Sequence, residues 1–150
     1  MNDIGSIMTR EPVTCPEDLR VQAVAALMRT RHVGSVVVVS ADNGKRKPLG
    51  VVTDRDIVIE VVATGLDAAA ITAGDIIAQP VILIHEHDDL RTAIHKMRSR
   101  GIRRLPVVDL HGELVGVVSQ DDLLSVLSHE LSTLTRVAEH QPQQEARARP

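Results

Sequence analysis

Apolar residues form two kinds of pattern along the first half of the chain, and each pattern predicts a different element. One set recurs at the three- and four-residue spacing of a helix face, and its members are Val21, Val24, Ala25 and Met28. The β-branched run at 36–39 is instead typical of a short buried strand. Turn residues at 42–44 and a second apolar run at 49–52 then predict a hairpin. Asp18 is expected to be the N-cap of the helix that follows it.

The second half of the chain repeats the first. Met-Arg-Thr-Arg at 28–31 returns as Met-Arg-Ser-Arg at 97–100, and the segment at 49–57 returns at 115–123. The shift is 69 residues at the first block and 66 at the second, so a loop of the second copy is three residues shorter. Repeated units that cannot bury their own apolar faces pack on one another, which makes the junction between the copies the expected ligand site.

Each copy is predicted to run strand, helix, strand, strand, helix after a short helical opening. The openings lie at 4–9 and 74–80, and extended segments follow at 13–15 and 81–84. The remaining features of the second copy are the helix stripe Leu90, Ala93, Ile94 and Met97, the N-cap Asp88, the strands at 105–108 and 114–118, and the turn at 110–112. We therefore expect an α/β fold of two pseudo-symmetric β-α-β-β-α repeats packed through their sheets. The expected repeats span 4–68 and 72–134, and the aperiodic segment at 141–150 is expected to be a flexible tail.

Composition narrows the class of protein. With 150 residues, 43% of them hydrophobic, and a net charge of −3, the chain is typical of a globular protein. The absence of Phe, Tyr and Trp disfavours single-stranded nucleic acid, which is bound by stacking on aromatic rings. The single cysteine, Cys15, excludes an intrachain disulfide and favours a reducing cytoplasm. Neither a membrane span nor a signal peptide is readable, so we expect a cytoplasmic protein without a membrane partner.

The candidate chemistry begins at two equivalent strand ends. Thr53-Asp54-Arg55-Asp56 and Ser119-Gln120-Asp121-Asp122 each follow an apolar strand and open a helix. A hydroxyl followed three residues later by a carboxylate resembles a capping box that satisfies main-chain N–H groups. A carboxylate in this place can also accept hydrogen bonds from both hydroxyls of a ribose. The two roles are compatible.

These motifs, taken in order, carry a family resemblance. They are Ile7-Met8-Thr9, the helices that end near Met28 and Met97, Leu105-Pro106-Val107-Val108, and Gly-Val-Val-Thr/Ser-x-x-Asp in both copies. The span from Ile4 to His140 resembles a tandem pair of CBS domains, a Bateman module. The first copy is similar to small stand-alone bacterial CBS-pair proteins without a catalytic domain. The resemblance thus implies a regulatory protein rather than an enzyme, with no cofactor required.

The resemblance also implies which residues bind a ligand. In that family the Asp of Thr/Ser-x-x-Asp typically holds the ribose of an adenine nucleotide, which implicates Asp56 and Asp122, assisted by Thr53 and Ser119. The family's basic positions facing phosphate fall on Arg103 and Arg104, so the favoured cleft combines these with Thr53 and Asp56. The opposite cleft, with Ser119, Asp122 and Ser35, has only Arg31 or His32 nearby. The residues expected to cover the base or line the cleft are Val52, Val81, Ile82, Leu105 and Pro106.

The leading hypothesis is a sensor of AMP, ATP or another adenosyl compound that forms a homodimer and regulates a protein unknown from the sequence. The alternative is a ligand-free oligomerisation scaffold, whose surface would use Ile57, Val61, Val62, Leu123, Leu124 and Leu127. His85 and His87 alternate on a predicted strand, as two ligands of a metal-dependent hydrolase would, but no third ligand is identifiable. The basic segment at 91–104 is interpreted as a solvated helix face rather than a nucleic-acid footprint.

Overall fold

The computed structural model describes residues 3–42 and 44–149, so Asn43 of the predicted turn lies outside the described residues. The first half contains α1 (Ile4–Ile7), β1 (Thr9–Arg10), β2 (Thr14–Pro16), α2 (Val21–Arg31), β3 (Ser35–Asp42), β4 (Lys45–Thr53), α3 (Asp54–Ile57) and the π-helix η1 (Val58–Val62). The second half contains α4 (Ala73–Ile76), β5 (Ile84–His85), α5 (Leu90–Arg100), β6 (Arg104–Val108), β7 (Leu114–Ser119) and α6 (Gln120–Ala148). The predicted α/β organisation in two repeats is confirmed.

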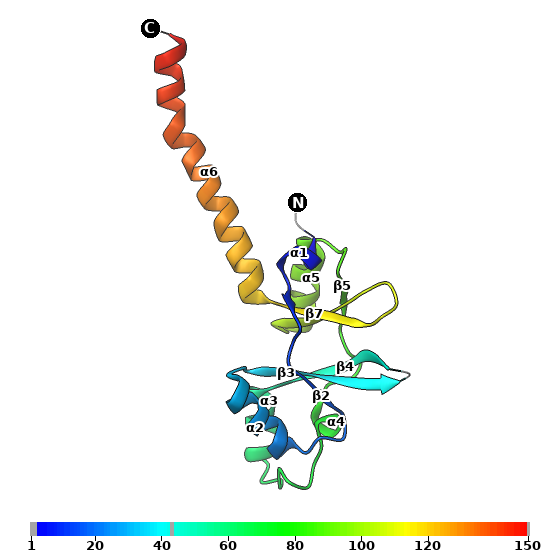
Figure 1. Cartoon of the computed structure of the whole chain (residues 1–150). Helices are drawn as coiled ribbons and strands as arrows, with labels where there is room; N and C mark the ends of the chain where they lie inside the picture. The colour runs from blue at the N-terminus through cyan, green and yellow to red at the C-terminus, as the bar shows by residue number, and fades with distance from the viewer. Residues whose placement is uncertain (1–2, 43, 150) are drawn as a thin grey trace.

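Two mixed sheets face each other across the junction between the repeats (Figure 1). The first-repeat sheet has the order β2-β3-β4, with β2 parallel and β4 antiparallel to β3. The second-repeat sheet contains the same arrangement as β5-β6-β7 and gains β1 at its edge. A buried cluster of Val37, Val39 and Leu114 joins the two sheets. The longer β3–β4 hairpin contains the three residues that the second copy lacks.

The opening segments of the two repeats are exchanged. α1 and β1 leave the first repeat, so Ile4 and Met8 pack in one core with Ile84 and Leu105 of the second. In the reverse direction, Ala73 of α4 is buried in the first-repeat core. Isolated bridges join Asp3 to Asp89 and Arg20 to Thr72, and these two pairs are equivalent under the repeat. The packing units therefore differ from the sequence boundaries 4–68 and 72–134.

Two equivalent glycines show how closely the exchanged segments pack. A Cβ on Gly50 of β4 would lie 2.8 Å from the Cβ of Ile77, which follows α4. A Cβ on Gly116 of β7 would lie 2.8 Å from the main-chain oxygen of Thr9, next to Met8. Real Cβ atoms do not approach other atoms so closely, so any larger residue would push the exchanged segment away. The glycine of the Gly-Val-Val motif is thus required where the exchanged segment packs against the strand.

The predicted N-caps Asp18 and Asp88 are wrong. α5 is capped by Asp89, whose Oδ1 accepts from the main-chain N–H of Thr92 at 2.8 Å. The N-cap residue of α2 is Arg20, whose side chain makes no capping hydrogen bond. The N–H groups of Val21 and Gln22 instead donate to the carbonyls of Ile71 and Ala68, at 2.9 and 3.0 Å. The segment that links the repeats therefore satisfies the start of α2, which local sequence alone does not reveal.

The C-terminal helix α6 leaves the body of the protein and projects beyond it (Figure 1). It runs on to Ala148, so residues 141–148, predicted to be part of an irregular flexible tail, are helical. Every residue from 127 to 149 is exposed. Within the described ranges, none of the helices combines the length and the apolarity that a bilayer crossing requires.

Candidate functional site

The two hydroxyl-x-x-carboxylate motifs form capping boxes at matching places in the repeats. The main-chain N–H of Thr53 donates to Asp56 Oδ2 at 2.8 Å, and the N–H of Asp56 donates to Thr53 Oγ1 at 3.1 Å. Ser119 and Asp122 make the same pair of bonds, at 2.7 and 3.2 Å. These bonds satisfy N–H groups at the starts of α3 and α6. The capping role expected from the sequence is confirmed.

Four of the predicted ligand-binding residues line one cavity. Thr53 and Asp56 come from the end of β4 and from α3, whereas Arg103 immediately precedes β6 and Arg104 begins it. The cavity has a volume of about 1040 Å³. Clefts that hold drug-sized or cofactor-sized ligands have volumes of about 300–1,000 Å³, so this space is large enough for a nucleotide. The structure brings these residues of both repeats together.

Charged residues of both signs surround this larger cavity. Besides Asp56, Arg103 and Arg104, they include residues that the sequence reading did not assign to the site, namely Asp54, Arg55, Glu60 and Asp75. The main-chain N–H and the hydroxyl of Thr72 hold the pKa of Asp75 below its ordinary value of 3.8, so this carboxylate is charged at neutral pH. Among residues 3–42 and 44–149, no carboxylate lies within 4.0 Å of the Arg103 or Arg104 guanidinium. Both are therefore available to an anionic ligand.

The aliphatic residues predicted to cover the base do not line the larger cavity. Val52 and Leu105 are fully buried in the two cores, and Pro106 is also buried. Val81 and Ile82 line neither of the two cavities between the repeats. The aliphatic residues that do line the larger cavity are Val51, Leu66, Ile71, Ile76 and Ile102. Successive strand residues face opposite sides of a sheet, and it is Val51 rather than Val52 that faces the cavity.

A smaller cavity of about 340 Å³ lies at the equivalent place on the other side of the junction. Ser35, Ser119 and Asp122 line it, as the sequence predicted for the opposite cleft. Arg31 and His32, expected to be its nearby cations, are not among the lining residues. The cation is Arg104, which lines both cavities.

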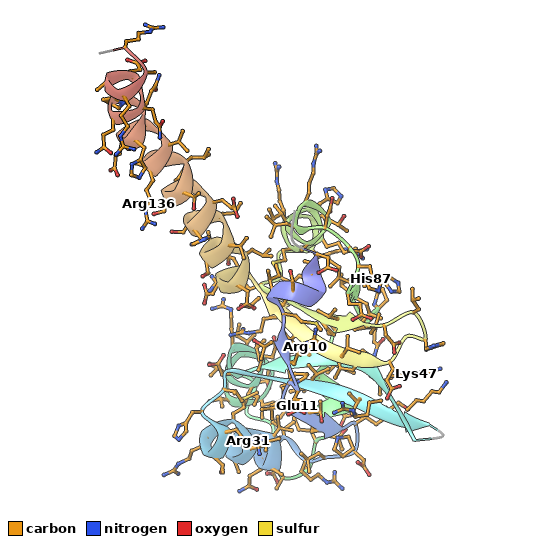
Figure 2. The ribbon with its side chains drawn as sticks, turned by 45° about the horizontal axis from the view of Figure 1, so that its top comes forward. Arg10, Glu11, Arg31, Lys47, His87 and Arg136 are labelled. Carbon is orange, nitrogen blue, oxygen red and sulfur yellow. The ribbon has the colours of Figure 1, made fainter. Side chains whose placement is uncertain are left out.

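The smaller cavity has a more acidic lining than the sequence suggested. Glu11 and Asp121 join Asp122 there, so three carboxylates face one guanidinium. Glu11 lies where the chain passes from one repeat to the other, next to Arg10 (Figure 2). The two cavities therefore differ in volume and in charge, which favours an anionic ligand in the larger one.

The proposed histidine pair does not alternate along a strand. His85 ends β5, whereas His87 lies in the turn after it, with its Nδ1 3.7 Å from Asp3 Oδ2 and its Nε2 3.8 Å from Glu86 Oε1. His87 lies in the half of the molecule that contains α5 and β7 (Figure 2). Across the described part of the chain, no three His, Cys, Asp or Glu side chains are grouped so that they could hold a metal ion.

The single thiol is buried rather than reactive. Cys15 of β2 is 3% exposed and packs in the first-repeat core. Burial raises its pKa to about 11, which suppresses the thiolate that a nucleophile would need. Cys15 is therefore a core residue.

Comparison with known proteins gives a consistent result. The CBS domain family matches residues 4–63 and 73–129. The chain is 39% identical over 132 residues to the uncharacterized protein MK0525 of Methanopyrus kandleri, covering 87% of this chain and 65% of that protein. It is 32% identical over 141 residues to the CBS domain-containing protein YhcV of Bacillus subtilis, covering 92% and 96% of the two chains.

A solved structure is similar over nearly its whole length. The CBS domain protein PAE2072 from Pyrobaculum aerophilum, complexed with AMP, superposes with a TM-score of 0.76 and 35% sequence identity. The match covers 87% of this chain and 98% of that protein.

Proposed function

The chain belongs to the CBS domain family as a tandem pair of repeats, and from this we propose that it is a non-catalytic regulatory module that senses an adenine nucleotide in its larger cavity. The observation that supports this function most is the meeting of Thr53 and Asp56 with Arg103 and Arg104 around one space of about 1040 Å³. AMP in the similar protein PAE2072 supports the ligand class. AMP, ATP and other adenosyl compounds share the chemistry that this site would recognise.

Each part of the ligand has a complementary group in the proposed site. The Asp56 carboxylate accepts hydrogen bonds from ribose hydroxyls, and its Oδ2 is already oriented by the N–H of Thr53. Arg103 and Arg104 donate to the phosphate. Ile71, Ile76 and Ile102 provide the aliphatic surface for the base, which an aromatic ring would provide in other proteins. A micromolar affinity requires about 8 kcal/mol, which a few such contacts supply.

We further propose that the sensor works in the cytoplasm as a homodimer and acts on a separate target protein. The exposed residues Val58, Ile59 and Val62 of η1 support an interface, because apolar side chains grouped on one short helix mark a contact surface. The same observation favours the second candidate function, a ligand-free oligomerisation scaffold. Ligand titration distinguishes the two.

The test uses Asp56→Ala with Asp122→Ala as its matched control. Both variants lose the same capping bond, but only Asp56 lines the larger cavity. AMP at a hundred times its Kd stabilises the parent by about 2.7 kcal/mol, or roughly 5–10 °C in Tm. Asp56→Ala is expected to lose this shift and at least tenfold in calorimetric affinity, since a charge-assisted hydrogen bond contributes about 1.5–3 kcal/mol. Asp122→Ala is expected to keep the shift.

Two outcomes would contradict the proposal. A parent protein whose Tm does not respond to AMP, ATP or other adenosyl compounds would favour the scaffold. A shift that Asp122→Ala abolishes and Asp56→Ala preserves would assign the ligand to the smaller cavity.

A further inference from the structure

The exposed part of α6 carries a regular apolar stripe that no other part of the described structure covers. Leu124, Leu127, Leu131 and Leu134 are 54%, 44%, 67% and 66% exposed. Together with Ala138 they follow the alternating three- and four-residue spacing of a heptad repeat, and we call these five residues the α6 seam. A monomeric helix surface rarely exposes so many leucines in register. Figure 2 shows Arg136 on this projecting part of α6, away from both repeats.

We propose that the α6 seam pairs in parallel with the α6 seam of a second copy of this chain, forming a short two-stranded coiled coil. Leucines at alternating three- and four-residue spacing are the pattern that such a pair buries, because each side chain inserts between four residues of the facing helix. The partner that covers the α6 seam is therefore a helix with the same leucine spacing, and α6 of a second copy is such a helix. This inference does not depend on the ligand-binding function.

Charge permits the pairing of two identical helices. The positions that flank the seam at its centre are Ser128, Glu130, Thr135 and Val137. In a parallel pair, Glu130 of one helix lies across from Thr135 of the other, so no like charges meet. The charged residues Arg136 and Glu139 lie outside the seam, where they stay solvated.

A groove at the base of α6 extends the apolar surface. The seam from Leu124 to Ala138 is only about 21 Å long at 1.5 Å per residue, which is short for an isolated coiled coil. A cavity of about 490 Å³ between α5 and α6 continues it, and its apolar lining is Ile94, Met97, Ile102, Leu123, Leu124 and Leu127. Ile94 is 40% exposed there. The second copy would therefore bury this groove together with the seam.

The distribution of apolar residues selects the parallel orientation. All the leucines of α6 lie between Gln120 and Leu134, and residues 139–149 contain no Leu, Ile, Val or Met. A parallel pair places the two apolar halves and the two grooves side by side. An antiparallel pair would instead place the polar C-terminal half of each helix opposite the apolar groove of the other copy. Neither groove would then have an apolar partner.

The first experiment measures the mass of the full chain in solution by light scattering. Leu131→Glu combined with Leu134→Glu puts charges into the seam, and Ser132→Glu combined with Thr133→Glu puts the same charges on the outer face. Because residues 131–134 are all exposed and belong to neither core, each variant should keep the Tm of the body. We expect the seam variant to have half the mass of the parent and the outer-face variant to keep it. An equal mass for the seam variant and the parent would overturn the proposal.

The second experiment tests the orientation. Ala138→Cys lies in the seam near its C-terminal end, so in a parallel pair the two introduced thiols meet, whereas in an antiparallel pair they lie far apart. Glu139→Cys, one residue along and outside the seam, is the matched control. Mild oxidation should give a covalent dimer with Ala138→Cys only. No cross-link, or equal cross-linking of both variants, would contradict parallel pairing.

Discussion

At the scale of single residues, the capping carboxylates have a structural as well as a ligand-binding importance. Asp56, Asp75, Asp89 and Asp122 all accept hydrogen bonds at helix starts. In Asp89 the carboxylate Oδ1 accepts from both the hydroxyl and the main-chain N–H of Thr92, at 2.7 and 2.8 Å. The hydroxyl bond is the main reason that the pKa of Asp89 lies below its ordinary value of 3.8. For Asp75 and Asp89, whose pKa values these bonds lower, the charge of the carboxylate is therefore linked to folding.

This linkage predicts acid sensitivity. A carboxyl whose pKa is lower in the folded chain stabilises the fold above its unfolded pKa and loses that contribution as the pH falls through its folded pKa. The contribution of Asp89 should thus be complete at pH 6 and should decrease below pH 3.8. Asp89→Asn keeps an oxygen acceptor but cannot ionise. We expect its Tm to be below that of the parent at pH 6 and the difference to shrink as the pH falls below 3.8. A constant difference would show that the charge of Asp89 does not contribute.

The residue scale also shows what the sequence could predict about the site. Thr53 and Asp56 are predicted because Thr/Ser-x-x-Asp recurs after a strand in both repeats, whereas Arg103 and Arg104 are implied by the resemblance to CBS domains. Val51 was missed in favour of Val52, because a run of consecutive valines carries no alternation that would tell which sheet face meets the cavity. Asp75 was missed because it lies near the cavity only through the exchange of α4. The sequence therefore predicts the motif residues, but it does not predict which strand residues face the cavity or which segments of the two repeats come into contact.

At the scale of elements, the close pairing of β1 with β7 depends on Gly116. Within an ordinary strand, replacing glycine by alanine is favourable or neutral, because glycine has more freedom to lose on folding. At Gly116 the added Cβ would lie 2.8 Å from the main-chain oxygen of Thr9 and even closer to Met8 Sδ. The exchange of the openings was itself not predicted, since adjacency in sequence favours packing of each opening within its own repeat.

Gly116→Ala is therefore expected to destabilise the protein by about 1–3 kcal/mol, the usual cost of overpacking a core. The measurement is the urea midpoint of unfolding. Val115→Ala on the same strand is the comparison, because it removes partly buried apolar surface without forcing the strands apart. A Gly116→Ala variant as stable as the parent would show that β1 can shift away from β7 at no cost.

At the scale of the whole molecule, each core needs a segment from the other half of the chain. The second-repeat core contains Ile4 and Met8, and the first-repeat core contains Ala73. The contact of Val37 and Val39 with Leu114 adds a further link between the sheets. Unfolding one repeat would thus expose apolar residues of the other, so the pair should unfold as one cooperative unit.

Cys15 provides a reporter for this cooperativity. It is buried in the first repeat with its pKa raised to about 11, so it should react with a thiol reagent at pH 8 only when that repeat opens. Gly116→Ala lies in the second repeat. If the pair is one unit, this variant should speed the labelling of Cys15 by the factor that matches its loss of stability, about 5- to 150-fold for 1–3 kcal/mol. Unchanged labelling would mean that the repeats open independently.

The exchange of α1 and α4 bears on how such a protein can originate and be divided. A polypeptide containing one half alone would keep its own strands but would lack the short helix that fills its core. The hairpin glycine, Gly50 or Gly116, would no longer be covered by the exchanged segment. Each half therefore depends on the other for part of its core. We therefore expect that neither half folds alone and that the two repeats can be inherited or transplanted only together.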